Sequence, residues 1–269
     1  MTHREAIGIF DSGLGGLTVF KAVRELLPNE SLIYLGDTAR VPYGTKSAET
    51  IVRYSQECCE FLMQRKVKTI VVACNTASAY ALPQLTQQLT VPLLGVIAPG
   101  VESALRQSKT KSIGVIGTPA TIASNAYARK IKELSRDARV VSLACPLFVP
   151  LVEEGWLDNE VTMAAARRYL ETLQTEKIDT LILGCTHYPL LKNTIAHVVN
   201  HGVTLIDSAE AVAFALRQLL TEKKLLAGEE TNGRNAKHEL YVTDLPARFE
   251  TIAGRFLGTT LPPVKRVEL

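Results

Sequence analysis

Two cysteines follow similar apolar segments and are the residues of this chain best suited to moving protons. Cys74 ends the segment TIVVAC, and Cys185, 111 residues later, ends TLILGC. Each is followed at once by a hydrogen-bonding pair, Asn75-Thr76 or Thr186-His187. Near a helix N-terminus, oriented N–H groups would lower the pKa of such a thiol from its ordinary value of about 8.5. The pattern predicts two reactive thiols that could serve as acid and base.

Metal ligation is the competing interpretation of Cys74 and Cys185. Thiolate and imidazole are both zinc ligands, and His187 stands two positions after the second cysteine. Nothing else in the sequence completes a ligand set around either thiol. His197 and His201 have the i, i+4 spacing of a helical metal site but lack the Glu of an H-E-x-x-H motif, and we expect them to be solvated. No metal is therefore expected.

The other three cysteines are expected to be structural. Cys58 and Cys59 fall inside an amphipathic helical pattern, where a buried thiol behaves as a small hydrophobe. Cys145 also ends an apolar segment, but Pro146 removes an N–H beside it, and we expect this thiol to pack in the core. The odd total of five cysteines, with no CxxC spacing, argues against a disulfide framework and against structural zinc.

A glycine-rich segment, Asp11-Ser12-Gly13-Leu14-Gly15-Gly16, follows the first apolar segment and opens a helical pattern. It invites a dinucleotide interpretation, in which Asp37 imitates the acidic residue that binds the ribose. A GxGxxG motif starting at Gly13 would, however, need Gly or Ala at position 18, where Thr18 stands. Two alternatives stay open. One is a small anionic ligand held by backbone N–H groups with Ser12 as an extra donor, and the other is a tight strand-to-helix turn.

Short apolar segments rich in β-branched residues alternate with helical patterns along nearly the whole chain. Such segments predict parallel strands buried on both faces, and hence the α/β class with right-handed crossovers. The expected strands are Ala6–Phe10, Ser31–Leu35, Thr69–Ala73, Leu93–Ile97, Ser112–Ile116, Val140–Ala144, Thr180–Leu183 and Val203–Ile206. The expected helices are Leu14–Leu27, Ala48–Gln64, Ser78–Leu89, Ala120–Leu134, Leu147–Val152, Val161–Gln174, Leu190–Val199 and Ala209–Leu226.

The similarity of the two cysteine segments predicts two similar α/β domains, each a mainly parallel sheet flanked by helices. We expect the first domain to comprise residues 1–97 together with 208–269, including a strand at Glu239–Val242, and the second to comprise residues 98–207. The polar stretch Gly228–Lys237 is expected to be a surface loop. Because ligands of parallel sheets bind at the carboxyl ends of the strands, we expect the active site in the cleft between the domains.

The composition excludes several classes of function. The chain has 269 residues, of which 46% are hydrophobic and 21% are charged, and its formal net charge is +3. A charge this small gives no reason to expect a nucleic-acid partner. No apolar run is long enough to cross a bilayer, and the N-terminus lacks the apolar segment of a secretion signal. We therefore expect no membrane partner, and a cytoplasmic protein with free thiols.

Five segments resemble the glutamate racemases. They are FDSGLGGLTV at 10–19, GDTARVPYG at 36–44, VVACNTA at 71–77, ACPLFVPLVEEG at 144–155 and LGCTHYPLL at 183–191. Together they cover essentially the whole chain, in order. The CNTA and GCTHYP segments alone would indicate the wider aspartate/glutamate racemase superfamily. The DSG-x-GG and VPYG segments narrow the resemblance to the glutamate branch.

The resemblance implies a racemase that needs no cofactor and supplies D-glutamate for bacterial peptidoglycan. It implies that Cys74 and Cys185 are the two acid–base thiols, activated by Asp11, Glu153 and His187. Without it, Glu153 and Glu154 would be taken for surface charges. The residues implied to bind the ammonium and carboxylates of glutamate are Asp11, Ser12, Tyr43, Gly44, Asn75, Thr76, Thr118, Thr121, Thr186 and His187.

Other functions fit parts of the same pattern. Another racemase of the superfamily would share the cysteine segments, whereas an arylmalonate-type decarboxylase protonates from one face and needs only one such cysteine. A solute-binding protein would also have two α/β domains around a cleft, but such proteins are usually exported. The sequence leaves open whether the chain forms a homodimer.

Overall fold

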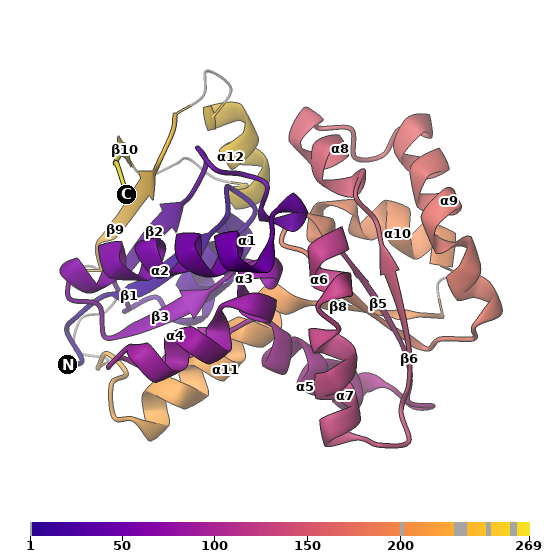
Figure 1. Ribbon diagram of the computed structural model, residues 1–269, viewed down its shortest axis with the longest axis horizontal. Helices are drawn as coiled ribbons and strands as arrows, with labels where there is room; N and C mark the ends of the chain where they lie inside the picture. The colour runs from indigo at the N-terminus through magenta and orange to yellow at the C-terminus, as the bar shows by residue number, and fades with distance from the viewer. Residues whose placement is uncertain (1, 200–201, 229–235, 246–248, 259–262) are drawn as a thin grey trace.

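The computed structural model describes residues 2–199, 202–228, 236–245, 249–258 and 263–269. His201 and most of the expected surface loop 228–237 lie outside these residues. Within the described residues, two parallel sheets stand side by side, each with helices packed against it (Figure 1). The α/β class that the sequence predicts is therefore confirmed.

The first sheet contains six strands in the order β10-β9-β2-β1-β3-β4, and all of its strand pairs are parallel. Its strands are β1 (Ile7–Asp11), β2 (Leu32–Gly36), β3 (Thr69–Val72), β4 (Leu93–Gly95), β9 (His238–Val242) and β10 (Val264–Arg266). The accompanying helices are α1 (Leu17–Leu26), α2 (Ala48–Gln64), α3 (Asn75–Tyr80), α4 (Leu82–Gln88) and α12 (Phe249–Leu257), with a 3-10 turn at Tyr43–Thr45. The short strand β10 was not expected from the sequence.

The second sheet contains four parallel strands in the order β6-β5-β7-β8. Its strands are β5 (Ser112–Gly117), β6 (Arg139–Ala144), β7 (Thr180–Gly184) and β8 (Thr204–Asp207). The accompanying helices are α6 (Pro119–Ala123), α7 (Ala126–Leu134), α8 (Phe148–Glu154), α9 (Glu160–Thr175) and α10 (Lys192–Val199), with a 3-10 turn at Tyr188–Leu191. Each strand predicted for this sheet is found within one residue of its expected bounds.

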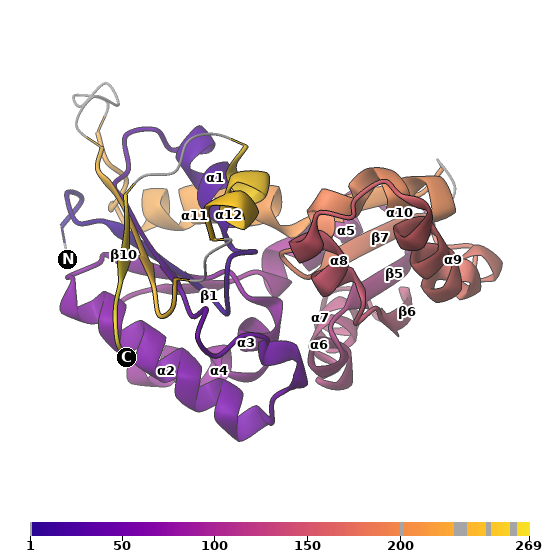
Figure 2. The same cartoon turned by 90° about the horizontal axis from the view of Figure 1, so that it is seen from above.

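Two helices join the sheets: α5 (Ile97–Gln107) follows β4, and α11 (Ser208–Glu222) follows β8. Helix α11 packs against α1 beside the first sheet, while α5 packs against α11, against α7 and against β7 of the second sheet (Figure 2). The expected strand Leu93–Ile97 is wrong at its end, because Ile97 already begins α5, a helix that the sequence did not predict. The domain boundaries expected near residues 97 and 208 fall at these two helices and stay a prediction.

Two helices predicted as continuous are broken in the structure. The predicted Ser78–Leu89 helix is α3 followed by α4, because Pro83 in the first turn of α4 has no N–H to continue the helix. The predicted Ala120–Leu134 helix divides into α6 and α7 at Asn125, whose φ of 56° is left-handed. These breaks matter because α3 and α7 both carry residues that reach the site described below.

No helix among the described residues combines the length and apolar character that crossing a bilayer requires.

Candidate active site

The carboxyl ends of four central strands carry the predicted site residues. Strand β1 ends at Asp11 and pairs with β3, which leads into Cys74. In the second sheet, β5 leads into Thr118 and pairs with β7, which leads into Cys185. A Cβ added to Gly15, four residues after the end of β1, would overlap Oγ1 of Thr186, the residue after Cys185, so the ends of the two sheets face each other. The arrangement brings one thiol from each sheet into a shared site.

Cys74 is the N-cap of α3 and is only 6% exposed. Its Sγ accepts the Ala77 N–H at 3.4 Å and lies 3.5 Å from the Ser12 hydroxyl. Burial, and after it the carboxyl of Asp11, raises the pKa of Cys74 to about 12, although Ser12 and Ala77 act in the opposite direction. The expectation of a lowered pKa is therefore wrong for this thiol, because loss of solvent outweighs the helix N-terminus. At neutral pH Cys74 holds its proton.

Asp11 is fully buried beside Cys74. Its Oδ2 accepts the Gly13 N–H at 3.1 Å, whereas its Oδ1 has no hydrogen-bond partner among the described residues. Burial raises the pKa of Asp11, against the lowering effect of His187 and of nearby backbone N–H groups. An unpaired buried carboxyl oxygen is costly, and a cationic group of a ligand would satisfy it.

Cys185 is the first member of a chain of three polar groups. Its Sγ lies 3.9 Å from Nδ1 of His187, and Nε2 of that histidine lies 3.1 Å from the Glu153 carboxylate. Burial alone would lower the pKa of His187, but its hydrogen bonds with Cys185 and Glu153 outweigh burial and raise the pKa to about 10. The imidazole is then a cation at neutral pH, and it lies beside Cys185.

The raised pKa of His187 predicts a pH dependence of stability. A histidine that ionises at about pH 10 when folded and at about 6.5 when unfolded stabilises the fold fully below pH 6.5 and loses that effect as the pH rises to 10. The difference in unfolding free energy between the wild type and His187→Asn should therefore shrink over this window, by at most about 1.4 kcal/mol per pH unit. Urea titrations of both proteins at pH 6.5, 8 and 9.5 measure it, and a difference that does not change with pH would refute the assignment.

Two residues of α12 support this chain of groups, and sequence reasoning missed them. The ring of Phe256 packs edge-on against His187 with centroids 5.2 Å apart, and Arg255 donates to the backbone carbonyl of Glu153 at 2.5 Å. Gly155 ends α8 with a φ of 77°, and a Cβ there would lie 2.5 Å from the Arg255 guanidinium. No local sequence motif predicts these contacts, because α12 lies about 70 to 100 residues after His187 and Glu153 in the chain.

Three threonine hydroxyls from the two sheets meet beside Cys74. Oγ1 of Thr76 lies 3.0 Å from Oγ1 of both Thr118 and Thr121, and these two lie 3.0 Å from each other. Gly44 approaches the same place, since a Cβ on it would lie 2.7 Å from Cβ of Thr118. The cluster supplies several rotatable donors in one place, as binding of a carboxylate requires.

Close approach of the two cysteine segments depends on Gly15. A Cβ at this position would overlap Oγ1 of Thr186 and would lie 2.6 Å from Nδ1 of His187. Thr186 is itself buried at this contact. The glycine-rich segment is thus a tight turn that lets the second sheet's site residues approach the first sheet, which explains its composition without a nucleotide.

Tyr43 is a predicted site residue, but its side chain points into the core beside the first sheet. Its hydroxyl donates to Asp37 and lies 3.8 Å from Sγ of Cys58, within the core of the first sheet. The ring thereby fixes the turn that presents Gly44 to Thr118. A contact between residue 43 and a ligand would come from its backbone.

The structure also bears on the other three cysteines and on the alternative of a metal site. Cys58, Cys59 and Cys145 are buried in the hydrophobic core, and burial raises the pKa of each. Among the described residues, no group of three or more His, Cys, Asp or Glu side chains is arranged to hold a metal ion.

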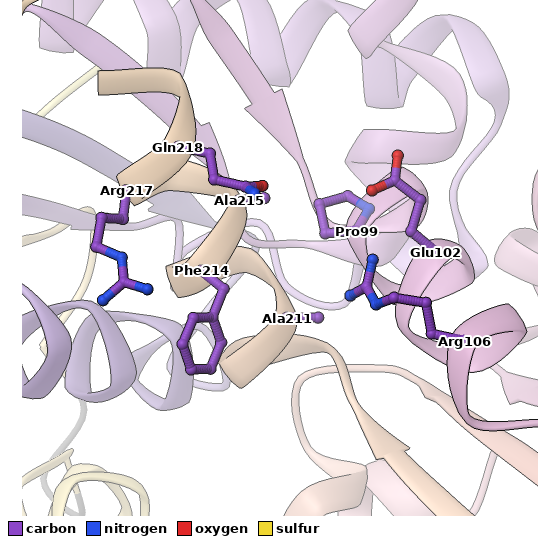
Figure 3. Close-up of a pocket in the computed structure, with 8 residues that line it drawn as sticks. All are labelled: Pro99, Glu102, Arg106, Ala211, Phe214, Ala215, Arg217 and Gln218. Carbon is purple, nitrogen blue, oxygen red and sulfur yellow. The ribbon is translucent and has the colours of Figure 1, made fainter. Parts of the chain in front are cut away.

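A separate cavity of about 320 Å³ lies between α5 and α11 (Figure 3). It is lined by residues of the two helices: Pro99, Glu102, Arg106, Ala211, Phe214, Ala215, Arg217 and Gln218. None of the predicted site residues lines this cavity, so it is distinct from the site around the two thiols.

Comparison with known proteins identifies the class of enzyme. The family model described as Asp/Glu/Hydantoin racemase matches residues 14–216, and the chain belongs to this family. It is accordingly an amino-acid racemase, an isomerase. The resemblance to the glutamate branch is also confirmed: a glutamate racemase of Geobacter metallireducens is 52% identical over 98% of this chain and 97% of its own length.

Solved structures of glutamate racemases share the whole fold. The enzyme from Francisella tularensis, solved in complex with D-glutamate, superposes with a TM-score of 0.92 at 40% identity, covering 99% of this chain and 98% of its own. An isoform from Bacillus anthracis gives a TM-score of 0.94 at 42% identity, with the same coverage. The two-sheet arrangement is thus that of this branch, and the substrate is a small molecule.

Proposed function

We propose that this chain interconverts L- and D-glutamate, with Cys74 and Cys185 acting as two acid–base groups on opposite faces of the substrate. One observation carries the proposal: two buried thiols, one from each sheet, have different polar partners. Cys74 lies against Ser12 and Asp11, whereas Cys185 lies against His187 and through it Glu153. The two thiols therefore stand in different surroundings, as expected of two acid–base groups that act on opposite faces of one substrate.

The chemistry follows from this asymmetry. The thiolate removes the proton from Cα of the substrate, and the opposite thiol delivers its own proton to the other face. The charge that develops on the α-carboxylate in between needs donors already in place, and hydroxyl, amide and backbone N–H groups at the strand ends are of the kind that would supply them. Asp11, whose Oδ1 has no hydrogen-bond partner among the described residues, would accept from the substrate ammonium. After each turnover the two thiols have exchanged protonation states.

The product class suggests a biological role. D-glutamate is a component of bacterial peptidoglycan, and we propose that this activity supplies it. Support comes from the glutamate racemases that share the fold over nearly the full length of the chain.

A single assay tests the activity. When the protein is incubated with L-glutamate alone, optical rotation should fall to zero as the two enantiomers reach equal concentration. A decarboxylase would release CO₂ instead. Binding of glutamate with no change in rotation, and no exchange of its α-proton with solvent, would favour the solute-binding alternative and refute the proposal.

The distal part of the site predicts specificity for glutamate over aspartate. Thr118 and Thr121, together with the turn ending at Gly44, come from segments that meet at one end of the site and could fix the second carboxylate at the longer reach of glutamate. One methylene is typically worth about 10- to 200-fold in discrimination. We therefore expect kcat/KM for aspartate to be lower by about this factor. Rates measured with both amino acids test this, and comparable kcat/KM values would rule it out.

A further inference from the structure

Tyr127 connects the surroundings of the two thiols. It lies in α7 of the second sheet's domain and is 2% exposed. Its hydroxyl donates to Oδ1 of Asn75 at 2.5 Å, the residue that follows Cys74 in the first sheet's domain. Its ring lies against Gly184, the residue before Cys185, where an added Cβ would be 3.1 Å from Cε2.

Asn75 is left with an unused donor by this bond. The residue is 3% exposed, and its Nδ2 is buried without a hydrogen-bond partner among the described residues. Buried amide N–H groups are rarely left unpaired, because they lose their bonds to water and gain nothing in return. An orphaned donor at the start of α3, beside an acid–base thiol, points to an acceptor that arrives with the ligand.

The direction of the Tyr127 bond decides which end of the amide faces the ligand. An asparagine side chain can flip by exchanging its oxygen and nitrogen, and only its hydrogen bonds select one orientation. In the structure the Tyr127 hydroxyl donates its proton to Oδ1 of Asn75. A donating hydroxyl holds Oδ1 and leaves Nδ2 as the free end.

We propose that Tyr127 is a positioning residue that fixes the amide of Asn75, so that Nδ2 donates to a carboxylate oxygen of the substrate. The proposal rests on the proposed function, which supplies a substrate with two carboxylates. Tyr127 itself touches no reacting atom. Its effect on substrate binding is transmitted by Asn75, so the test must show whether the effect of changing Tyr127 depends on Asn75.

A double-mutant cycle isolates that effect. We expect Tyr127→Phe, which keeps the ring and removes the hydroxyl, to raise KM for both enantiomers about five- to tenfold, a typical value for one hydrogen bond. Because the bond to a carboxylate is present in both the ground and transition states, kcat should change little. In an Asn75→Ala background, Tyr127→Phe should have no further effect on KM.

Tyr80→Phe is the matched control. Tyr80 also donates a hydroxyl hydrogen bond across to the second sheet's domain, but to the backbone carbonyl of Ala120 at 3.1 Å and not to a side chain of the site. Its loss should leave KM unchanged, even if the melting temperature falls as much as in Tyr127→Phe. If Tyr127→Phe does not fold, Asn75→Asp still tests the donor, because it keeps an acceptor for Tyr127 and removes the N–H groups.

The outcomes separate the two proposals. If neither the wild type nor Tyr80→Phe racemises glutamate, the proposed function fails. If both do so, an unchanged KM in Tyr127→Phe overturns the role of Tyr127. An equal rise of KM on adding Tyr127→Phe to the wild type and to the Asn75→Ala variant overturns it as well, as does wild-type KM in Asn75→Asp.

Discussion

Replacing either Cys74 or Cys185 with serine is expected to abolish most racemisation in both directions. Each face of the substrate depends on one of these side chains, and a serine hydroxyl is a far weaker acid than a thiol. General acid–base groups typically contribute about 10²- to 10⁴-fold, so kcat should fall at least into this range. Initial rates from L- and D-glutamate, measured separately for each variant, give the result.

The variants should still bind glutamate, because the proposed ligand contacts come from other residues. Cys58→Ser and Cys59→Ser are the controls, since both thiols lie in α2 within the core and should leave turnover nearly intact. Cys145→Ser should cost stability more than rate, because that side chain is fully buried in the core. Full activity in either Cys74→Ser or Cys185→Ser would contradict the two-base mechanism.

Isotope exchange tests the same mechanism without a mutation. In D₂O, the product formed from either enantiomer should carry deuterium at Cα. The incoming deuteron comes from the opposite cysteine, which has equilibrated with solvent, while the abstracted proton stays on the first. Substantial retention of the original proton in the product would mean that one group serves both faces. A requirement for added pyridoxal phosphate or metal would overturn the mechanism as well.

Asp11→Asn and Glu153→Gln should lower kcat far more than they destabilise the fold. Asp11 is buried beside Cys74, and its Oδ1 has no hydrogen-bond partner within the part of the chain that the structure describes. An amide at its place could no longer take up a proton. Glu153 holds His187 through a 3.1 Å contact and thereby sustains the positive charge beside Cys185. Losses of about 10²-fold or more are expected, measured as kcat together with melting temperature.

Glu154→Gln is the matched control for Glu153→Gln. The two glutamates are neighbours at the end of α8, but Glu154 is exposed whereas Glu153 contacts His187. Near-wild-type turnover in both Asp11→Asn and Glu153→Gln would reduce Asp11 to a turn-forming residue and Glu153 to a surface charge.

The regular elements could be predicted because their causes are local. Short continuous apolar segments such as Thr69–Val72 and Thr180–Gly184 are typical of strands buried on both faces, and both are found in the parallel sheets. Helix α2 has its predicted bounds because Ser47 caps it, its Oγ accepting the Thr50 N–H. Helix α5 was missed because Pro99 and Gly100 near its start are residues that usually oppose helices, and packing against α11 overrides them.

By itself, the sequence determined which residues stand at strand ends and which family motifs they form. That information was sufficient for the fold class and the enzyme family, because strand periodicity and motif spacing are properties of neighbouring residues. The tertiary structure decided how those residues behave. Burial, which depends on the whole fold, raised the pKa of Cys74 where its local helix N-terminus suggested the opposite. The ring of Phe256 packs against His187, and Tyr127 donates a hydrogen bond to Asn75. Both contacts join segments that are distant in the sequence, and only folding brings such residues within reach of each other.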